Sequence, residues 1–338
     1  LLAGGLGLSI SAGLAACSTP NAPSRAPSSL LGPPTGAAPS AGQRVVEQSL
    51  TARPLTLDLG GRQVATWAYA DRVPGPVLRA TAGDFLRLTL RNELPAPTTI
   101  HWHGIRLRNE ADGVPGMTQD PVESGGRFVY EFTAPDPGTY FFHPHVGVQL
   151  DRGLYAPLVI DDPDEPGDYD AEWVVVLDDW IDGTGATPDE VLEQLIADGE
   201  NSGGMGGMGH GSMGGMGMGD PPWGDAGDVI YPHFLINGRT PADPEVLNAK
   251  PGQRVRLRII SAASDTIFTV ALGGHRMTLT HSDGFAVEPV EAEAFYIGMG
   301  ERYDATVTLR DGVFPLVARP FGKTSGGQAM ALVRTGAG

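Results

Sequence analysis

The histidines of this chain are concentrated in two short H-x-H pairs. "TTIHWHGIRL" holds His101 and His103, and "TYFFHPHVGV" holds His143 and His145, so these four make up half of the eight histidines in 338 residues. On a β-strand, residues i and i+2 face the same side, and each pair can direct both imidazoles into one space. Neutral imidazole suits zinc, copper, iron and nickel, so two neighbouring strands of this kind predict a metal site.

The residues around the pairs favour a metal site over four structural histidines. Trp102, Phe141 and Phe142 are expected to bury the opposite faces of the strands and hold them rigid. A lone histidine is more often a hydrogen-bonded core residue than a ligand, but two matched pairs favour ligation.

The elements that must position these histidines are strands. "FLRLTLRN" (85–92) and "RFVYEFTA" (127–134) alternate apolar and polar residues, which predicts half-buried strands. "WVVVLDDW" (173–180) is a fuller apolar run and predicts a strand buried on both faces. Short strands separated by Gly/Pro turns predict an all-β sandwich.

The chain also repeats itself at a spacing near 170 residues, which predicts two copies of one β-domain. The matched segments are "AGDFLRLTLRN" (82–92) with "PGQRVRLRIIS" (251–261), "GRFVYEF" (126–132) with "ERYDATV" (301–307), and "PGTYFFHPH" (137–145) with "DGVFPLVAR" (311–319). We expect domains at 45–165 and 166–338, with a boundary at the methionine-rich segment 201–220 as the alternative.

The second copy lacks the histidines. "TIFTV" (266–270) falls where "TIHWH" (99–103) falls in the first copy, so Phe268 and Val270 replace the first pair. On the same alignment Val317 and Arg319 replace the second pair. The scaffold therefore folds without these histidines, which indicates that the first copy keeps them for function.

One helix is predicted at residues 187–199, "TPDEVLEQLIADG". Thr187 is the expected N-cap, Pro188 the first helical residue, and Glu190 the partner in a capping box. Apolar residues give the helix one apolar face, and Gly199 is expected to end it.

Composition bounds the partners. The net charge of −17 argues against nucleic acid, because binding there depends on neutralising phosphates. A hydrophobic content of 41% is ample for the cores of two domains.

The N-terminus predicts export. Residues 1–17, "LLAGGLGLSISAGLAAC", form an apolar run that is too short to span a bilayer. The run ends in small residues, as an export signal does. "LAAC" at 14–17 resembles the lipobox of bacterial lipoproteins, which predicts a lipid anchor at Cys17 on the periplasmic or outer side of the cell membrane. The alternative is an ordinary cleaved signal with a chance cysteine. Residues 18–44 are rich in Pro, Ser, Ala and Gly and predict a flexible tether.

The histidine motifs carry a resemblance. "HWHG" and "HPHVG", with "ADGVPGMTQDPV" (111–122) between them, resemble the first two copper motifs of the multicopper oxidases, the laccase-like family. The resemblance covers most of residues 45–338. It implies an all-β fold of two tandem cupredoxin-like Greek-key β-sandwiches. It also implies a reaction that takes electrons singly from a substrate and reduces dioxygen to water.

Carried over to this sequence, the resemblance assigns a copper to each histidine. His101 would bind the type 2 copper, His103 and His143 would share one type 3 copper, and His145 would bind the other. Asp112 stands where family members can have a carboxylate that assists proton delivery. The alternative for Asp112 is a structural one, since Asp-Gly is a favourable turn dipeptide.

The chain also departs from the family pattern. Members need an H-C-H motif whose cysteine binds the type 1 copper, and no cysteine follows Cys17. We therefore expect a member whose third, C-terminal cupredoxin domain is missing and which is inactive alone. His275 and His281 resemble the ordinary middle domain of three-domain members.

A glycine-rich segment at 201–220 holds five of the nine methionines. Thioether sulfur suits Cu(I), and the segment resembles methionine-rich insertions of copper-tolerance members. The candidate ligands there are Met205, Met208, His210, Met213, Met216 and Met218. The alternative is a glycine linker with incidental methionines. This segment favours Cu(I) over a phenol as the reducing substrate.

Two other functions stay open. The chain could be a non-enzymatic exported protein that sequesters copper, or a structural relative that has lost its copper. The four intact histidines argue against the second of these.

Overall fold

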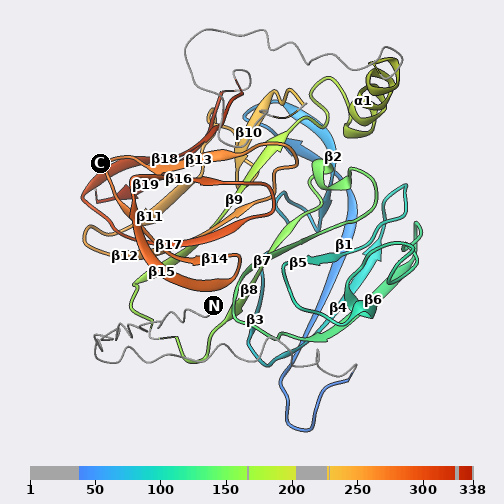
Figure 1. Ribbon diagram of the computed structural model, residues 1–338, viewed down its shortest axis with the longest axis horizontal. Helices are drawn as coiled ribbons and strands as arrows, with labels where there is room; N and C mark the ends of the chain where they lie inside the picture. The colour runs from blue at the N-terminus through green and yellow to red at the C-terminus, as the bar shows by residue number, and fades with distance from the viewer. Residues whose placement is uncertain (1–37, 166, 203–226, 228, 324–326, 337–338) are drawn as a thin grey trace, which may run out of the picture. The chain divides into compact units, whose positions relative to one another are not determined.

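A computed structural model of the protein describes residues 38–165, 167–202, 227, 229–323 and 327–336, all within one compact unit. Its strands form four sheets, and every named strand pair lies within residues 45–161 or within residues 171–335 (Figure 1). The predicted all-β fold is confirmed. The domain boundaries and the tether stay predictions, with the first strand beginning at Val45.

The first sandwich consists of two four-stranded sheets. One sheet has the order β2 (Gln63–Tyr69), β1 (Val45–Asp58), β4 (Phe85–Asn92) and β6 (Arg127–Thr133). The other has the order β3 (Leu78–Thr81), β8 (Ala156–Asp161), β7 (Gly138–His143) and β5 (His101–His103). Two short 3₁₀ helices, η1 (Asn109–Ala111) and η2 (Gln149–Arg152), lie in its loops.

The second sandwich consists of a six-stranded and a five-stranded sheet. The six-stranded order is β10 (His233–Ile236), β9 (Ala171–Trp180), β12 (Arg254–Ser261), β17 (Arg302–Thr308), β14 (Met277–Ser282) and β15 (Phe285–Ala292). The five-stranded order is β11 (Val246–Ala249), β19 (Ala329–Thr335), β18 (Gly312–Pro320), β13 (Phe268–Leu272) and β16 (Ala294–Ile297).

The two sandwiches repeat one topology, as the sequence repeat predicts. A parallel pair followed by an antiparallel one, β1–β4–β6, returns as β9–β12–β17. The same pattern in β3–β8–β7–β5 returns as β11–β19–β18–β13. The register corrects one detail of the alignment: His101 pairs with His143, and the equivalent Phe268 pairs with Pro320 instead of Val317. Strand β18 is longer than β7. An alignment that matches the first residues of the two strands therefore pairs the wrong residues at their C-terminal ends.

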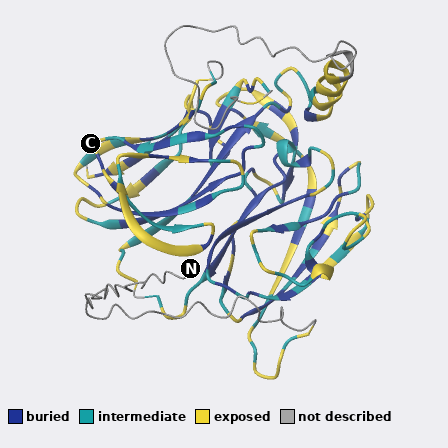
Figure 2. Ribbon diagram, in the orientation of Figure 1, coloured by how far each residue is buried: buried dark blue, intermediate teal, exposed yellow. Residues whose placement is uncertain are grey.

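The cores follow from the strand patterns. In β4 the polar residues Arg87, Thr89 and Arg91 face outwards. Leu86, Leu88 and Leu90 alternate with them and lie in the core of the first sandwich. A third hydrophobic cluster joins the sandwiches, with Phe141 of β7 against residues such as Trp180 of β9. All of β7 and the second half of β9 are accordingly buried, whereas the edge strand β15 is exposed along its length (Figure 2).

The helix α1 (Pro188–Ser202) confirms the predicted start and corrects the predicted end. The backbone N–H of Glu190 donates to Thr187 Oγ1 at 3.3 Å, and the N–H of Thr187 donates to Glu190 Oε2 at 2.7 Å, which is the capping box. Gly199 lies inside the helix and has no positive φ, so it does not form the expected left-handed C-cap.

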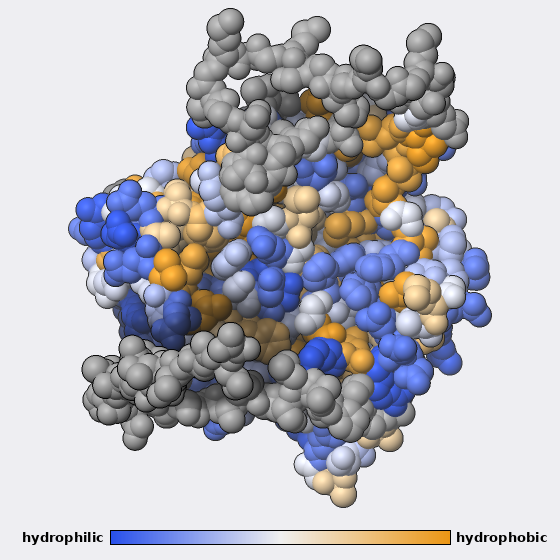
Figure 3. All heavy atoms as spheres, in the orientation of Figure 1, coloured by the Kyte–Doolittle hydropathy of each residue, from blue (hydrophilic) through white to orange (hydrophobic). Residues whose placement is uncertain are grey.

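Three apolar residues of α1 are exposed, whereas Val191 is half-buried. Leu192, Leu195 and Ile196 are 39%, 37% and 53% exposed. Figure 3 shows hydrophobic (orange) surface in the region of this helix. None of the helices that the structure describes is long and apolar enough to cross a membrane.

Candidate metal centre

Strands β5 and β7 lie side by side and carry three of the four paired histidines. They are antiparallel, with His101 opposite His143 and His103 opposite Phe141. His145 follows two residues beyond the end of β7. His101 and His103 face away from Trp102, whose fully buried ring points into the core, as the alternation of side chains on a strand requires.

Trp102 and Phe142 bury the opposite face of the strands as predicted, whereas the prediction for Phe141 is wrong, because it lies on the face that carries the histidines. The Trp102 ring lies 4.8 Å from the ring of Phe132 and 5.2 Å from that of Phe142, measured between centroids. On the opposite face, the Phe141 ring stacks on His103 at 4.5 Å. The histidine-bearing strands are therefore held by closely packed aromatic rings.

The four imidazoles converge on one space. The ring centroid of His101 lies 4.2 Å from that of His145 and 5.5 Å from that of His143. One ring nitrogen each from His101, His143 and His145 lie within 4.8 Å of one another, a group that could hold a metal ion. His103 is not a member of this group, and its Nδ1 is hydrogen-bonded to Nε2 of His143 at 3.1 Å.

Backbone carbonyls fix the orientation of two rings. The Nδ1 of His101 lies 2.9 Å from the carbonyl oxygen of Asp112, and the Nδ1 of His143 lies 3.0 Å from that of Pro144. A carbonyl can only accept, so both Nδ1 atoms carry the proton and both Nε2 atoms keep a lone pair. Metal-binding histidines are typically held in this way by a partner on the other ring nitrogen. In the metal-free chain Nε2 of His143 accepts from His103, and this bond would have to open for a metal.

Burial keeps three of the imidazoles, those of His103, His143 and His145, neutral. Burial, together with the positive charge of Arg302, lowers the pKa of His103 to about 3. Burial also lowers the pKa of His143 to about 3, with a smaller contribution from His103, and burial lowers the pKa of His145. Neutral rings at pH 7 leave lone pairs for a cation, so the donor set fits copper chemically.

Asp112 lies directly beside the centre. Its carboxylate Oδ1 is 3.3 Å from Nδ1 of His101, and its side chain is 31% exposed. The following Gly113 has φ +77° and packs so closely on the carbonyl of Ile100 that a side chain would overlap it. The Asp-Gly turn and the contact with His101 therefore occur together, so the turn does not exclude a functional carboxylate.

The remaining predicted ligands lie outside the described residues. These are Met205, Met208, His210, Met213, Met216 and Met218 of the methionine-rich segment, and the same holds for Cys17. His275 has a structural environment: its Nδ1 donates to the carbonyl of Gly273 and its Nε2 accepts from the N–H of Arg310.

The sequence did not reveal that the second sandwich reaches the histidines. A Cβ added to Gly300 would lie 2.7 Å from Cε1 of His103, so the backbone there touches the imidazole. The guanidinium of Arg302 packs equally closely on Gly104, which follows the first histidine pair. The only signal was the presence of charged residues in "ERYDATV", a segment that the repeat places in a buried strand.

Comparisons with known proteins match this chain to one family over most of its length. A family model described as Multicopper oxidase matches residues 52–165, and another of the same description matches residues 171–337. The chain is 49% identical over 300 residues to "Multicopper oxidase MmcO" of Mycobacterium tuberculosis, covering 87% of this chain and 58% of that protein. It is 32% identical to "Copper resistance protein A" of Pseudomonas syringae pv. tomato, covering 86% of this chain and 50% of that protein.

Solved structures give the same fold. A multi-copper oxidase from Pseudomonas Thermotolerans superposes with a TM-score of 0.68 at 29% identity, covering 88% of this chain and 65% of that chain. A laccase from Botrytis aclada superposes with a TM-score of 0.71 at 26% identity, covering 87% of this chain and 53% of that chain. The chain spans about half the length of the curated relatives it matches.

Proposed function

The chain belongs to the multicopper oxidase family, and on this premise we propose that its histidine pairs bind copper in an oxidase that reduces dioxygen to water. The observation that carries the proposal is the convergence of His101, His143 and His145, with ring nitrogens within 4.8 Å of one another. Bound copper would supply the one-electron chemistry that links a reducing substrate to dioxygen.

We assign the ligands as the family resemblance implies. His101 binds the type 2 copper, His103 and His143 share one type 3 copper, and His145 binds the other. The orientation of two rings supports this assignment, because backbone carbonyls hold Nδ1 of His101 and of His143 and direct each Nε2 towards the centre.

The proposed role of Asp112 is to hold a proton for the oxygen chemistry. Its partly exposed carboxylate can exchange protons with water, and it stands 3.3 Å from the His101 ring. The variant Asp112→Asn retains the backbone carbonyl that orients His101. It should therefore leave copper affinity unchanged and slow oxygen consumption by the complete enzyme.

The electron entry site comes from elsewhere in this proposal. A type 1 copper needs a thiolate, and the only cysteine in the sequence is Cys17. We propose that a further cupredoxin domain supplies the type 1 copper and the remaining cluster ligands, and that residues 1–338 alone do not turn over substrate.

The methionine-rich segment supports a proposal for the substrate, and the N-terminal segment supports one for the location of the protein. Soft methionine sulfur at 201–220 favours Cu(I) over a phenol, which corresponds to a role in copper tolerance. The signal-like segment with Cys17 supports export and a lipid anchor on the periplasmic or outer side of the membrane.

Copper binding by purified residues 18–338 tests the ligand assignment. Electron paramagnetic resonance (EPR) of bound Cu(II) should show coupling to imidazole nitrogen, and the sample should have no intense blue absorption because no thiolate is present. The variant His143→Ala should weaken binding at least tenfold, whereas the control His233→Ala, on β10, should not. Equal binding by both variants, or a strong blue band, would contradict the assignment.

A copper-sequestering protein is the second candidate. It is favoured by the methionine-rich segment combined with the single cysteine. Copper-dependent oxygen consumption by the natural protein, purified from its source, separates the two functions. Oxygen uptake with Cu(I) supports the oxidase, and copper binding without uptake supports sequestration.

A further inference from the structure

We propose that residues 300–304 of the second sandwich are a positioning element for the histidine centre of the first. They hold both histidine-bearing strands, at the His103 ring and at Thr139. The inference rests on the proposed function, because it concerns ligands that the proposal assigns to copper. It gives the second sandwich, which lacks the histidine pairs, a direct role at the centre.

The first contact is with the His103 ring. A Cβ built on Gly300 would lie 2.7 Å from Cε1 and 2.9 Å from Nε2 of His103, so only a glycine allows this approach. Its φ of +75° also favours glycine. The loop is fixed because the N–H of Gly300 donates to the carbonyl of Ser261 at 3.0 Å, and Arg302 Nη1 donates to the carbonyl of Gly300 at 2.9 Å.

The second contact is with β7 at Thr139. Arg302 Nε donates to the carbonyl of Thr139 at 3.2 Å, and Thr139 Oγ1 donates to Asp304 Oδ1 at 2.6 Å. All three side chains are buried, at 4%, 1% and 2% exposure for Arg302, Thr139 and Asp304. Thr139 lies four residues before His143 on one strand, so the two side chains face the same side. Fixing Thr139 therefore fixes the strand that aims His143.

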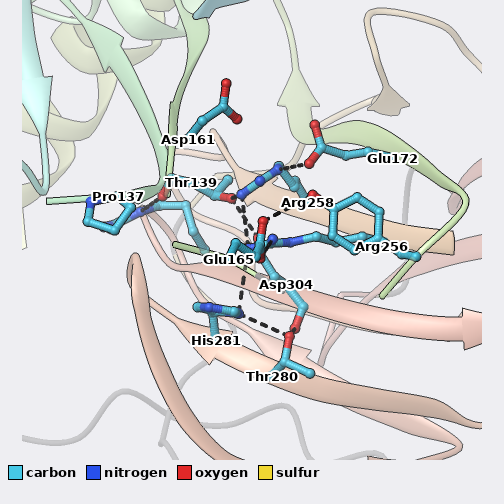
Figure 4. Close-up of polar contacts among 12 residues, drawn as sticks. Pro137, Thr139, Asp161, Glu165, Glu172, Arg256, Arg258, Thr280, His281 and Asp304 are labelled. Atoms are coloured by element: carbon cyan, nitrogen blue, oxygen red, sulfur yellow. Dashed lines mark hydrogen bonds and ion pairs between the residues drawn. The ribbon is translucent and has the colours of Figure 1, made fainter. Parts of the chain in front are cut away.

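Asp304 is itself held by an ion network that Figure 4 shows. Its Oδ2 accepts from Arg256 Nη2 at 2.6 Å and from Arg258 Nη1 at 3.1 Å. Arg258 Nη1 also donates to Thr139 Oγ1 at 2.9 Å, so this hydroxyl both accepts and donates. Arg258 bonds to Glu172 on its other side. Buried charges that are mutually satisfied have few alternative arrangements, which makes Thr139 a fixed point.

These contacts could simply join two sandwiches without influencing the histidines. The geometry favours positioning, because Gly300 touches an imidazole and Thr139 lies on the face of β7 that carries His143. If residues 300–304 position the rings, adding one methyl group at residue 300 must alter the histidine rings. The same backbone strain at a glycine away from the rings must not.

Two matched glycine variants make that comparison. Gly300 and Gly252 have φ of +75° and +81°, so alanine meets a similar backbone strain at both. A Cβ at Gly252 meets nothing within 4 Å, whereas a Cβ at Gly300 meets His103. Gly300→Ala should shift the ring NMR signals of His103 in the metal-free protein and weaken Cu(II) binding about tenfold or more. Gly252→Ala should do neither. Equal ring spectra and equal Cu(II) affinity in the two variants would overturn the proposal.

A second pair covers the case in which Gly300→Ala does not fold. Thr139→Val removes the hydroxyl at similar volume, and Thr139→Ser retains it. The valine variant should shift the ring signals of His143, and the serine variant should restore them. Unchanged His143 signals in both variants would refute the second contact. If the unaltered chain does not bind copper, the proposed function fails, but the metal-free ring spectra still decide this inference.

Discussion

The buried carboxylate of Asp304 makes a measurable prediction for stability. Replacing Asp304 by asparagine should lower the free energy of unfolding by about 3 kcal/mol, because removing one partner of a buried ion pair costs about 3–5 kcal/mol. Asp304 is 2% exposed and accepts hydrogen bonds from Arg256 and Arg258, whose side chains are 4% and 2% exposed.

The lower end of that range applies for a structural reason. Each arginine keeps another carboxylate after the substitution: Arg256 retains Glu165, and Arg258 retains Glu172. The asparagine carbonyl can also still accept from Thr139. The substitution therefore removes only the one negative charge that Arg256 and Arg258 share.

Urea unfolding followed by tryptophan fluorescence measures this difference, provided that the slope with urea is unchanged. Asp283→Asn is the control, since Asp283 also pairs with an arginine, Arg302, at 3.1 Å but has a half-exposed side chain. Exposed pairs contribute about 0–1 kcal/mol, so the control should lose little. If Asp304→Asn loses no more than Asp283→Asn, the buried network does not stabilise the fold.

The other predictions concern a turn, a titrating carboxyl group and the helix. The control Gly125→Ala should lower the free energy of unfolding in urea by roughly 1–2 kcal/mol, and Gly113→Ala should lower it by at least twice as much. Both glycines have positive φ, but only a Cβ at Gly113 meets a backbone carbonyl, that of Ile100. Similar losses in the two variants would contradict this. Burial raises the pKa of Asp151 to about 7, so its protonated form stabilises the fold at acidic pH and that stability is lost as pH rises through 7. Asp151→Asn should therefore match the unaltered protein near pH 4 and exceed its unfolding free energy near pH 8; a constant difference between the two proteins would refute the assignment. Thr187→Ala should remove the helix cap, at a cost of about 1 kcal/mol, and speed amide exchange in α1 alone; exchange that is unchanged there would show that the cap contributes nothing.

Local patterns made the strands and the histidine pairs predictable. β4 has the predicted bounds and β6 differs from its prediction by one residue, because a period of two is a property of neighbouring residues. The same rule places His101 and His103 on one face. It could not show that His103 bonds to His143 in the metal-free chain, since that depends on ring rotations across two strands.

The capping signals of α1 were equally local, and they predicted its start. They could not predict what its apolar residues contact, because amphipathicity indicates that a helix has an apolar face but not which surface covers it. Ile196, at 53% exposure, illustrates the difference.

The burial of two arginines on β12 could not be predicted from the sequence. "RVRLRIIS" predicts the strand β12, but alternation would place Arg256 and Arg258 at solvent, and both are buried. Their burial depends on carboxylates distant in the sequence, such as Asp304 on β17. A single sequence gives no pairing between such distant residues, so neither the network nor its contact with Thr139 could be predicted.

That contact explains why a copy without the histidine pairs belongs to the centre. β7 lies against β12 and β17, so the strand that carries His143 has the ligand-free copy behind it. In a single sandwich the side of β7 at Thr139 would face water, and a strand held only by its own sheet leaves its ligands more freedom. With Arg302 and Asp304 bonded to Thr139, ring orientation in the first copy depends on buried charges in the second. The repeat thus supplies two different things from one topology: ligands from one copy and their fixed support from the other.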